Sequence, residues 1–374
     1  MTSSAGNSSS SHGGSKQSNL IESLRKIFTS SYPPSGSVRG RPIPFNFTIK
    51  QDEAYDYFLE DDDPDELFEQ AVGFHDEVKA MLHNLTPADE AALDEYQLTN
   101  LSNLIFGSNL IEGAGAGLDI TYKLCQLVFT GQDKGIADQD MLRMEEYDER
   151  RKNLVTQDLP TDQANAAYRS RREIIQHARA LRHIVNAMVI EDKPLTERLI
   201  LDTHKILCHK VDSPDGMPYT SYAGIYRLES VVAGFSSFTP WEQVPREMAQ
   251  LITEFNRDIE QAAELGEMDP YALAAKMCHK FVNIHPFIDG NGRTCRLILN
   301  AILIKHAGAL VCLGEKEEDR DEYLTIAAKA SMAMASDDGE IEQKHHKGLA
   351  TLTLRHVKNY LMGFVDKLKK KGEE

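Results

Sequence analysis

The sequence predicts an all-α protein, a helical bundle that carries one small β-hairpin. Strand-forming residues are confined to residues 225–238, where helix formers are scarce. No repeat of solenoid length occurs, so the helices are expected to pack as a bundle rather than as an array. Elsewhere apolar residues recur at helical intervals of three and four, as in Ile174, Ala178, Leu181, Val185 and Met188.

The composition excludes several classes of function. The chain has 374 residues, of which 41% are hydrophobic, enough for at least one large core. Its net charge is −17, so we expect no nucleic-acid partner, because phosphate backbones attract basic surfaces. No apolar run reaches the roughly 18 residues that a membrane helix needs, so we expect no membrane partner and a cytoplasmic or nuclear location. The five cysteines are widely spaced, which favours reduced thiols.

Composition divides the chain into four parts. Residues 1–41 are rich in Ser and Gly and are predicted to be a disordered tail. Residues 42–160 form an N-terminal helical region, whose acidic start is better explained as a solvated helix face than as a calcium loop. Residues 161–365 form a second helical domain, and residues 366–374 are a short charged end.

Two adjacent helices are predicted from local signals in the second domain. Asp269 followed by Pro270 is typical of an N-cap and first helical position, and that helix runs toward His285. Residues 297–304 are apolar nearly all round, so the next helix should be the buried centre of the fold. Gly308 is expected to end it.

The most informative segment lies between these two helices and reads HPFIDGNGRTCR from His285 to Arg296. Its two glycines and its asparagine tolerate positive φ and let backbone amides converge at the start of the buried helix. A glycine-bearing turn at a helix N-terminus binds anions, and the two arginines add positive charge. We therefore expect a polyphosphate site made by Gly290, Asn291, Gly292, Arg293 and Arg296.

Two side chains of this segment are candidates for chemistry. Asp289 offers one hard carboxylate oxygen, which suits a Mg²⁺ ion that keeps its waters and shares phosphate oxygens. His285 can take a proton from an incoming hydroxyl, which makes it the candidate general base. The alternative is that His285 is an ordinary core histidine and the arginines are surface charges. The number of specified positions in so short a segment favours the functional interpretation.

The segment resembles the signature of the Fic family, His-x-Phe-x-Asp/Glu-Gly-Asn-Gly-Arg-x-x-Arg, without substitution. The resemblance implies a Fic-type helical bundle, with residues 161–365 as the catalytic domain. It also implies transfer of AMP from ATP to a Ser, Thr or Tyr hydroxyl of a target protein, auto-AMPylation included, with Mg²⁺ bridging the phosphates. Gly292, where the phosphorylating Doc-like branch has Lys, favours nucleotidyl transfer over phosphorylation.

The resemblance also assigns roles to residues of the loop. His285 would deprotonate the target hydroxyl, and Asp289 would hold the metal. The region of Asn291 and Gly292 would surround the α-phosphate, while Arg293 and Arg296 would bind the β- and γ-phosphates.

The resemblance extends from about residue 196 to about residue 326. It identifies residues 222–240 with the family's flap hairpin, whose edge binds the target segment as an added strand. The target-docking residues would be Tyr226, Val231 and Val232. A packed hairpin without a partner is the alternative. The chain departs from the family pattern at Trp241 and in residues 327–335, which lack an adenine-side asparagine, so base selectivity stays open.

A second motif lies upstream. The stretch SNLIEG from Ser108 to Gly113 resembles the family's inhibitory pattern, Ser/Thr-x-x-x-Glu-Gly/Asn. Apolar spacing predicts a helix over about residues 97–113 that places Ser108 and Glu112 on one face. A carboxylate in the last turn opposes the helix dipole by about 0.3–1 kcal/mol unless a cation meets it. The resemblance supplies Arg296 as that cation, so that Glu112 would hold bound ATP in an unproductive pose.

Three functions from different classes stay open. The first is an AMP-transferring enzyme under this autoinhibition, the second a nucleotide-binding protein whose chemistry has lapsed, and the third a helical interaction protein. The presence of both His285 and Asp289 favours the first, because a lapsed site needs neither. Within the enzyme interpretation, removal of AMP from a modified protein is the alternative. The resemblance also allows a homodimer, for which the sequence has no interface signature.

Overall fold

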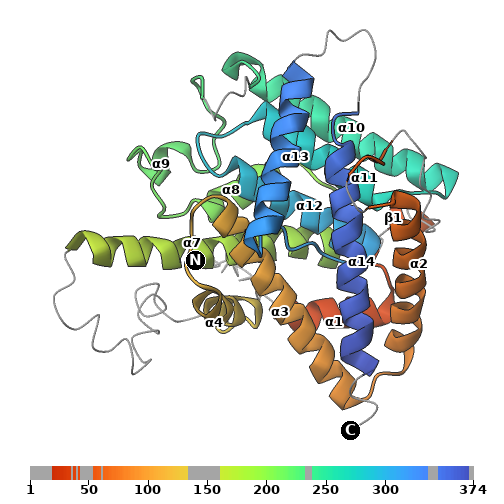
Figure 1. Ribbon diagram of the computed structural model, residues 1–374. Helices are drawn as coiled ribbons and strands as arrows, with labels where there is room; N and C mark the ends of the chain where they lie inside the picture. The colour runs from red at the N-terminus through yellow and green to blue at the C-terminus, as the bar shows by residue number, and fades with distance from the viewer. Residues whose placement is uncertain are drawn as a thin grey trace, which may run out of the picture.

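The computed structural model describes residues 19–34, 37–38, 41–42, 54–59, 62–133, 161–231, 238–335 and 344–369. Within these ranges the chain is helical apart from two short paired strands, as Figure 1 shows, and the predicted fold class is confirmed for the helices. The helices are α1 (Leu20–Ser30), α2 (Pro64–Met81), η1 (Leu82–Asn84), α3 (Pro87–Ile111), α4 (Leu118–Phe129), α7 (Thr161–Val185), η3 (Asn186–Ile190), α8 (Glu197–Leu207), α9 (Tyr219–Tyr222), η4 (Trp241–Gln243), α10 (Val244–Leu265), α11 (Pro270–Ile284), α12 (Asn291–Ala307), α13 (Glu317–Ala335) and α14 (Lys347–Lys369). The strands are β1 (Ser37–Val38) and β2 (Arg41–Pro42), which pair antiparallel.

Helix α12 forms the centre of the bundle. Every one of its residues except Gly292 is buried, because its apolar side chains point in all directions around the helix axis. It packs against α3, α7, α8 and α11. Gly308 ends it with a left-handed φ of 63°, as predicted.

Helix α11 leads directly into the candidate loop. Asp269 caps its N-terminus by accepting hydrogen bonds from the backbone amides of Tyr271 and Ala272, and Pro270 takes the first helical position. The helix ends at Ile284, because His285 has a left-handed φ of 51°. The predicted helix start and the loop position are therefore both confirmed.

The outer helices hold this centre in place. Helix α14 packs against α2, α3 and α11 (Figure 1) and runs through to Lys369, so the predicted charged end from residue 366 begins inside it. None of the described helices is both long and apolar enough to cross a bilayer.

Residues 20–30 differ from the disordered tail predicted for residues 1–41. They form helix α1, whose N-terminus is capped by the Asn19 side chain. The helix buries a regular apolar face and packs against α3. The prediction was wrong for this stretch because the surrounding Ser and Gly masked a helical spacing of Leu20, Ile21, Leu24 and Phe28.

The structure does not support the predicted β-hairpin flap. Residues 225–231 contain no strand, and residues 232–237 lie outside the described part of the chain. The Arg227 side chain gives a physical reason, because its Nε donates to the His285 carbonyl at 2.6 Å and its Nη1 to the Glu229 carbonyl at 2.9 Å. The Arg227 amide donates to the Pro286 carbonyl at 2.9 Å. The segment is thus bonded to the neighbouring loop rather than to a partner strand.

Candidate active site

The loop between α11 and α12 is closed by the side chain of Asn291. Its Oδ1 accepts from the Phe287 amide at 2.9 Å, and its Nδ2 donates to the Phe287 carbonyl at 2.8 Å. Phe287 is fully buried and anchors the loop in the core. Gly290 adopts a φ of 79°, which favours glycine, and α12 starts at the next residue. The Asn291 side chain is therefore engaged by the loop, and its backbone amide at the helix N-terminus is the group left available to an anion.

His285 is held in one tautomer. Its Nδ1 lies 3.2 Å from the Val282 carbonyl, which can only accept, so the proton is on Nδ1 and the lone pair is on Nε2. The ring stacks on Phe238 with centroids 3.9 Å apart. Burial lowers the pKa of His285 to about 4, opposed by the Val282 carbonyl, so the imidazole is neutral near pH 7. A neutral ring with a lone pair on Nε2 can accept a proton.

Asp289 points its carboxylate toward the start of α12. Its Oδ1 accepts from the Gly290 amide at 2.7 Å, and its Oδ2 lies 3.3 Å from Nη2 of Arg293. The side chain is 22% exposed. The described residues contain no cluster of three or more His, Cys, Asp or Glu that could hold a metal ion. A single accessible carboxylate fits Mg²⁺ when waters and phosphate oxygens supply the other ligands, so the donor set suits a metal that arrives with a nucleotide.

Arg296 is the most strongly engaged cation of the site. Its Nε donates to Ser108 Oγ at 2.8 Å, and its Nη2 donates to the Ser108 carbonyl at 2.8 Å and to Glu112 Oε1 at 2.7 Å. Its guanidinium lies over the Tyr323 ring, 5.6 Å from the centroid. The expected contact between Glu112 and Arg296 is therefore present.

The Glu112 carboxylate occupies the N-terminus of α12. A Cβ placed on Gly292 would overlap Glu112 Oε1, which shows how closely the carboxylate approaches the helix backbone. Burial raises the pKa of Glu112, but the charge of Arg296 and its hydrogen bond outweigh burial and leave the pKa below its usual value. Glu112 is thus an ionised carboxylate at the position where a helix N-terminus would bind an anionic ligand.

The end of α3 fixes the position of this carboxylate. The helix is longer than the predicted 97–113 segment, because it starts at Pro87, and it ends at Ile111 with Glu112 as its C-cap. A Cβ on Gly107 would overlap the Leu313 carbonyl, so α3 lies directly against that loop. One residue after Ser108, the Asn109 side chain bonds to His177 of α7 at 2.9 Å.

The predicted target-docking residues are not brought together as a strand edge in the described part of the chain. Tyr226 is half-buried, with its ring 5.8 Å from that of Phe287. Val231 is half-buried outside any strand, and Val232 lies outside the described residues.

Sequence reasoning missed the contribution of His204 on α8. Its ring is fully buried and its Nε2 lies 2.8 Å from the Asp289 carbonyl. A lone histidine on a predicted helix carries no signal that could have identified it.

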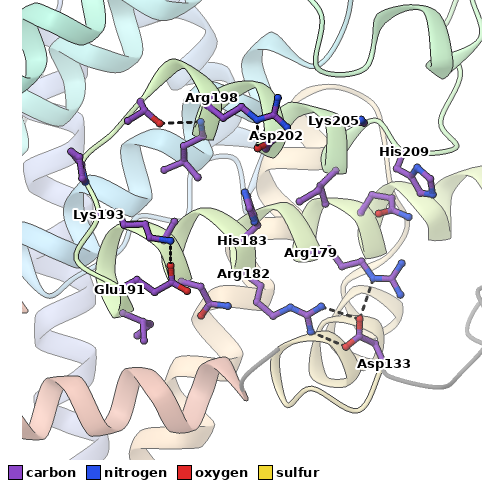
Figure 2. Close-up of a pocket in the computed structure, with 18 residues that line it drawn as sticks. Asp133, Arg179, Arg182, His183, Glu191, Lys193, Arg198, Asp202, Lys205 and His209 are labelled. Carbon is purple, nitrogen blue, oxygen red and sulfur yellow. Dashed lines mark hydrogen bonds and ion pairs between the residues drawn. The ribbon is translucent and has the colours of Figure 1, made fainter. Parts of the chain in front are cut away.

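A groove of about 930 Å³ lies away from this loop, between α7, η3 and α8 (Figure 2). None of the predicted site residues lines it. Its carboxylates form ion pairs that Figure 2 marks. Asp133 pairs with Arg179 and Arg182, Glu191 pairs with Lys193, and Asp202 pairs with Arg198. The groove is therefore a separate feature, and its acidic side chains are already neutralised by neighbours.

Comparison with known proteins points to one family. Residues 194–303 match the Fic/DOC family. Over 101 residues the chain is 38% identical to a Fido domain-containing protein of Dictyostelium discoideum, covering 27% of this chain and 66% of that protein. Over 133 residues it is 33% identical to the protein adenylyltransferase Fic of Drosophila ananassae, covering 36% of this chain and 24% of that protein. The chain thus spans less than two thirds of the length of these curated relatives.

Solved structures share the fold. The chain superposes with a TM-score of 0.56 on a Fic domain-containing signaling protein from Bacteroides thetaiotaomicron, covering 82% of this chain and 97% of the other at 19% identity. A Fic-1 structure from C. elegans gives the same TM-score and identity, covering 82% of this chain and 74% of the other. The likeness supports the Fic-type arrangement of helices around the candidate loop.

Proposed function

We propose that the chain, whose residues 194–303 match the Fic/DOC family, transfers AMP from ATP to a hydroxyl side chain of a target protein, itself included. The observation that carries the proposal is the loop from His285 to Arg296. It combines a neutral imidazole with a free lone pair, one accessible carboxylate and two buried guanidinium groups at a helix N-terminus.

The N-terminus of α12 would bind the phosphates of ATP. The first amides of a helix have no intrahelical acceptor and attract anions. Arg293 is buried, and its Nε has no hydrogen-bond partner among the described residues. A buried guanidinium nitrogen without a partner is costly in the free protein and can be satisfied by a phosphate oxygen. Arg296 would bind a second phosphate once Glu112 leaves it.

His285 would act as the general base. The target oxygen attacks the α-phosphorus, its proton moves to Nε2 of His285, and the bond between the α-phosphorus and the pyrophosphate oxygen breaks. The proton on Nδ1 stays there, and its hydrogen bond to the Val282 carbonyl keeps the ring oriented during the transfer. Asp289 would hold Mg²⁺, which neutralises phosphate charge when it is bound.

Glu112 would inhibit the transfer. Its carboxylate and a terminal phosphate of ATP are both anions that compete for Arg296 and for the start of α12. ATP bound beside Glu112 would then lack one cationic partner and take an unproductive pose. The proposal therefore predicts a low basal rate that rises when the carboxylate is removed.

Labelled ATP tests the proposal. We expect the Glu112→Gly variant with Mg²⁺ to incorporate label from [α-³²P]ATP into itself or into proteins of a cell lysate. The purified variant alone should incorporate no label into itself from [γ-³²P]ATP, which separates AMP transfer from phosphorylation. Adding His285→Ala should abolish the label. Absence of α-label in Glu112→Gly would contradict the proposed activity and favour a nucleotide-binding protein without chemistry. Binding of the target along residues 222–240, homodimerisation and the cellular compartment stay predictions.

A further inference from the structure

His204 lies beside the candidate loop although it is 85 residues away from Asp289 in the sequence. It is on α8, and its side chain is fully buried. Its ring stacks on Phe287, with centroids 3.6 Å apart and an interplanar angle of 3°. The imidazole therefore packs face to face against the residue that anchors the loop.

Two hydrogen bonds fix the proton on this ring. The Gly224 amide can only donate, and it lies 2.9 Å from Nδ1 of His204, so Nδ1 carries the lone pair. The Asp289 carbonyl can only accept, and it lies 2.8 Å from Nε2, so Nε2 carries the proton. The ring is thus an acceptor on one side and a donor on the other, which requires one defined tautomer.

The backbone around the ring leaves little room for another arrangement. A Cβ on Gly290 would lie 3.3 Å from Nε2 of His204 and 3.3 Å from Sγ of Cys208. Gly224 has a φ of 73°, and a Cβ there would lie 2.8 Å from the Leu201 carbonyl. Both glycines bring their backbones close to α8, with the imidazole between them.

The segment that His204 holds through Gly224 also contacts the other end of the loop. Three residues further on, Nε of Arg227 donates to the His285 carbonyl at 2.6 Å and its amide to the Pro286 carbonyl. His204 is therefore connected to the loop twice, directly at Asp289 and through residues 224–227 at His285.

We propose that His204 is a positioning residue for the candidate active site, which sets the orientation of Asp289 and fixes residues 224–227 against the loop. Holding the Asp289 carbonyl fixes the peptide from which the carboxylate projects, while the Gly290 amide holds Oδ1. The consequence for catalysis rests on the proposed function, but the hydrogen-bond arrangement does not.

The tautomer can be measured without any activity. A long-range ¹H–¹⁵N spectrum of the full chain, labelled with ¹⁵N-histidine, should show one ring with a protonated Nε2 and an unprotonated Nδ1. The Nε2 proton should exchange slowly with water because the ring is buried. These signals should vanish in His204→Gln, which assigns them. A His204 signal with the proton on Nδ1, or on both nitrogens, would overturn the proposal.

Three variants separate the contributions of the ring. In His204→Gln the side-chain amide reaches toward the Nε2 position and can donate to the Asp289 carbonyl. In His204→Asn the side chain can replace only the acceptor for the Gly224 amide. In His204→Phe only the stacking on Phe287 remains. Each variant is made in the Glu112→Gly chain. Its apparent Mg²⁺ requirement, kcat and KM for ATP are measured beside its melting temperature.

We expect the His204→Phe and His204→Asn variants to raise the half-saturating Mg²⁺ concentration and to lower kcat by about 10- to 100-fold. This is the usual loss when a hydrogen-bond partner of a metal ligand is removed. Gln should restore kcat more than Asn does. The control is His209→Phe, five residues further along the chain, whose ring packs edge-on against Tyr219. If folded Phe and Asn variants kept the Mg²⁺ requirement of their parent, the proposal would be wrong. If the Glu112→Gly parent itself incorporated no label, the proposed function would fail, and the tautomer would still test the positioning role.

Discussion

Removing the Glu112 carboxylate should free one N–H of Arg296 Nη2 without displacing the side chain. Nη2 of Arg296 donates to Glu112 Oε1, but Nε and Nη2 also donate to Ser108. The Glu112→Gly variant keeps both contacts to Ser108. It therefore leaves a preformed guanidinium at the N-terminus of α12, available to a phosphate of ATP.

The expected gain follows from the strength of the bond that ATP can form. A hydrogen bond to a charged group contributes about 1.5–3 kcal/mol. Since about 1.4 kcal/mol corresponds to a tenfold change, the rate should rise by about 10- to 150-fold if the bond forms in the transition state.

The same substitution should lower stability. Breaking a buried ion pair costs about 3–5 kcal/mol when one charge is left without a partner. Arg296 is 3% exposed, but the Glu112 side chain is 35% exposed, so water screens much of the attraction. With Ser108 still bound to Arg296, we expect a loss of about 1–2 kcal/mol in the free energy of unfolding.

The assay is incorporation of label from [α-³²P]ATP, measured with urea unfolding of the same samples. Glu112→Gln keeps the size of the side chain and should also activate, because it removes the competing charge. The matched control is Glu95→Gly, which removes an ion pair with Lys367 from the same helix far from the loop. A Glu112→Gly rate within about threefold of the unmodified chain, which is under 1 kcal/mol, or an equal rise in Glu95→Gly, would refute the reasoning.

Four further predictions concern acidity and folding. Because burial holds the pKa of His285 at about 4, this histidine should stay neutral and leave the transfer rate unchanged from pH 8 down to about pH 5. An inflection near pH 6.5 in a pH–rate profile would contradict this. The unfolded chain protonates this histidine at its ordinary value near 6.5, so its contribution should make urea stability fall as the pH drops from 6.5 to about 4. Arg227→Lys should lower the free energy of unfolding by about 2–3 kcal/mol in urea titrations, because an ammonium group cannot donate to all the carbonyls that the guanidinium binds. An unchanged urea midpoint would show that these hydrogen bonds contribute nothing to stability. Asp133→Ala should cost about 3–5 kcal/mol by the same measurement, since Asp133 and Arg182 are 4% and 3% exposed and the guanidinium would remain buried, whereas a loss under about 1 kcal/mol would contradict a desolvated pair.

Local signals predicted the helices that flank the loop. An N-cap followed by proline, an apolar run and a terminal glycine each act within a few residues, so Asp269, residues 297–304 and Gly308 could be interpreted correctly from the sequence. The contact between Glu112 and Arg296 could be predicted because a carboxylate at a helix C-terminus calls for a cation and the family pattern named one.

Longer-range contacts could not be predicted in this way. The irregular path of residues 225–231 depends on Arg227 bonding to the loop at His285, 58 residues further along the chain. His204 reaches Asp289 across a similar separation, and neither contact leaves a periodic pattern. Helix α1 was missed for a different reason, because its apolar face is short and lies in a segment whose average composition is that of a disordered tail.

The enclosure of α12 limits how this protein can be trimmed or recombined. The family match stops at residue 303, inside that helix, while α3 and α7 lie entirely before residue 194. An expression fragment limited to residues 194–303 would lack both α3 and α7, which pack against α12. The apolar surface of α12 would then be exposed to water, and the fragment would be prone to aggregation. The segment that contains the loop is therefore not expected to fold without α3 and α7, and a transfer of the site into another protein must include these helices.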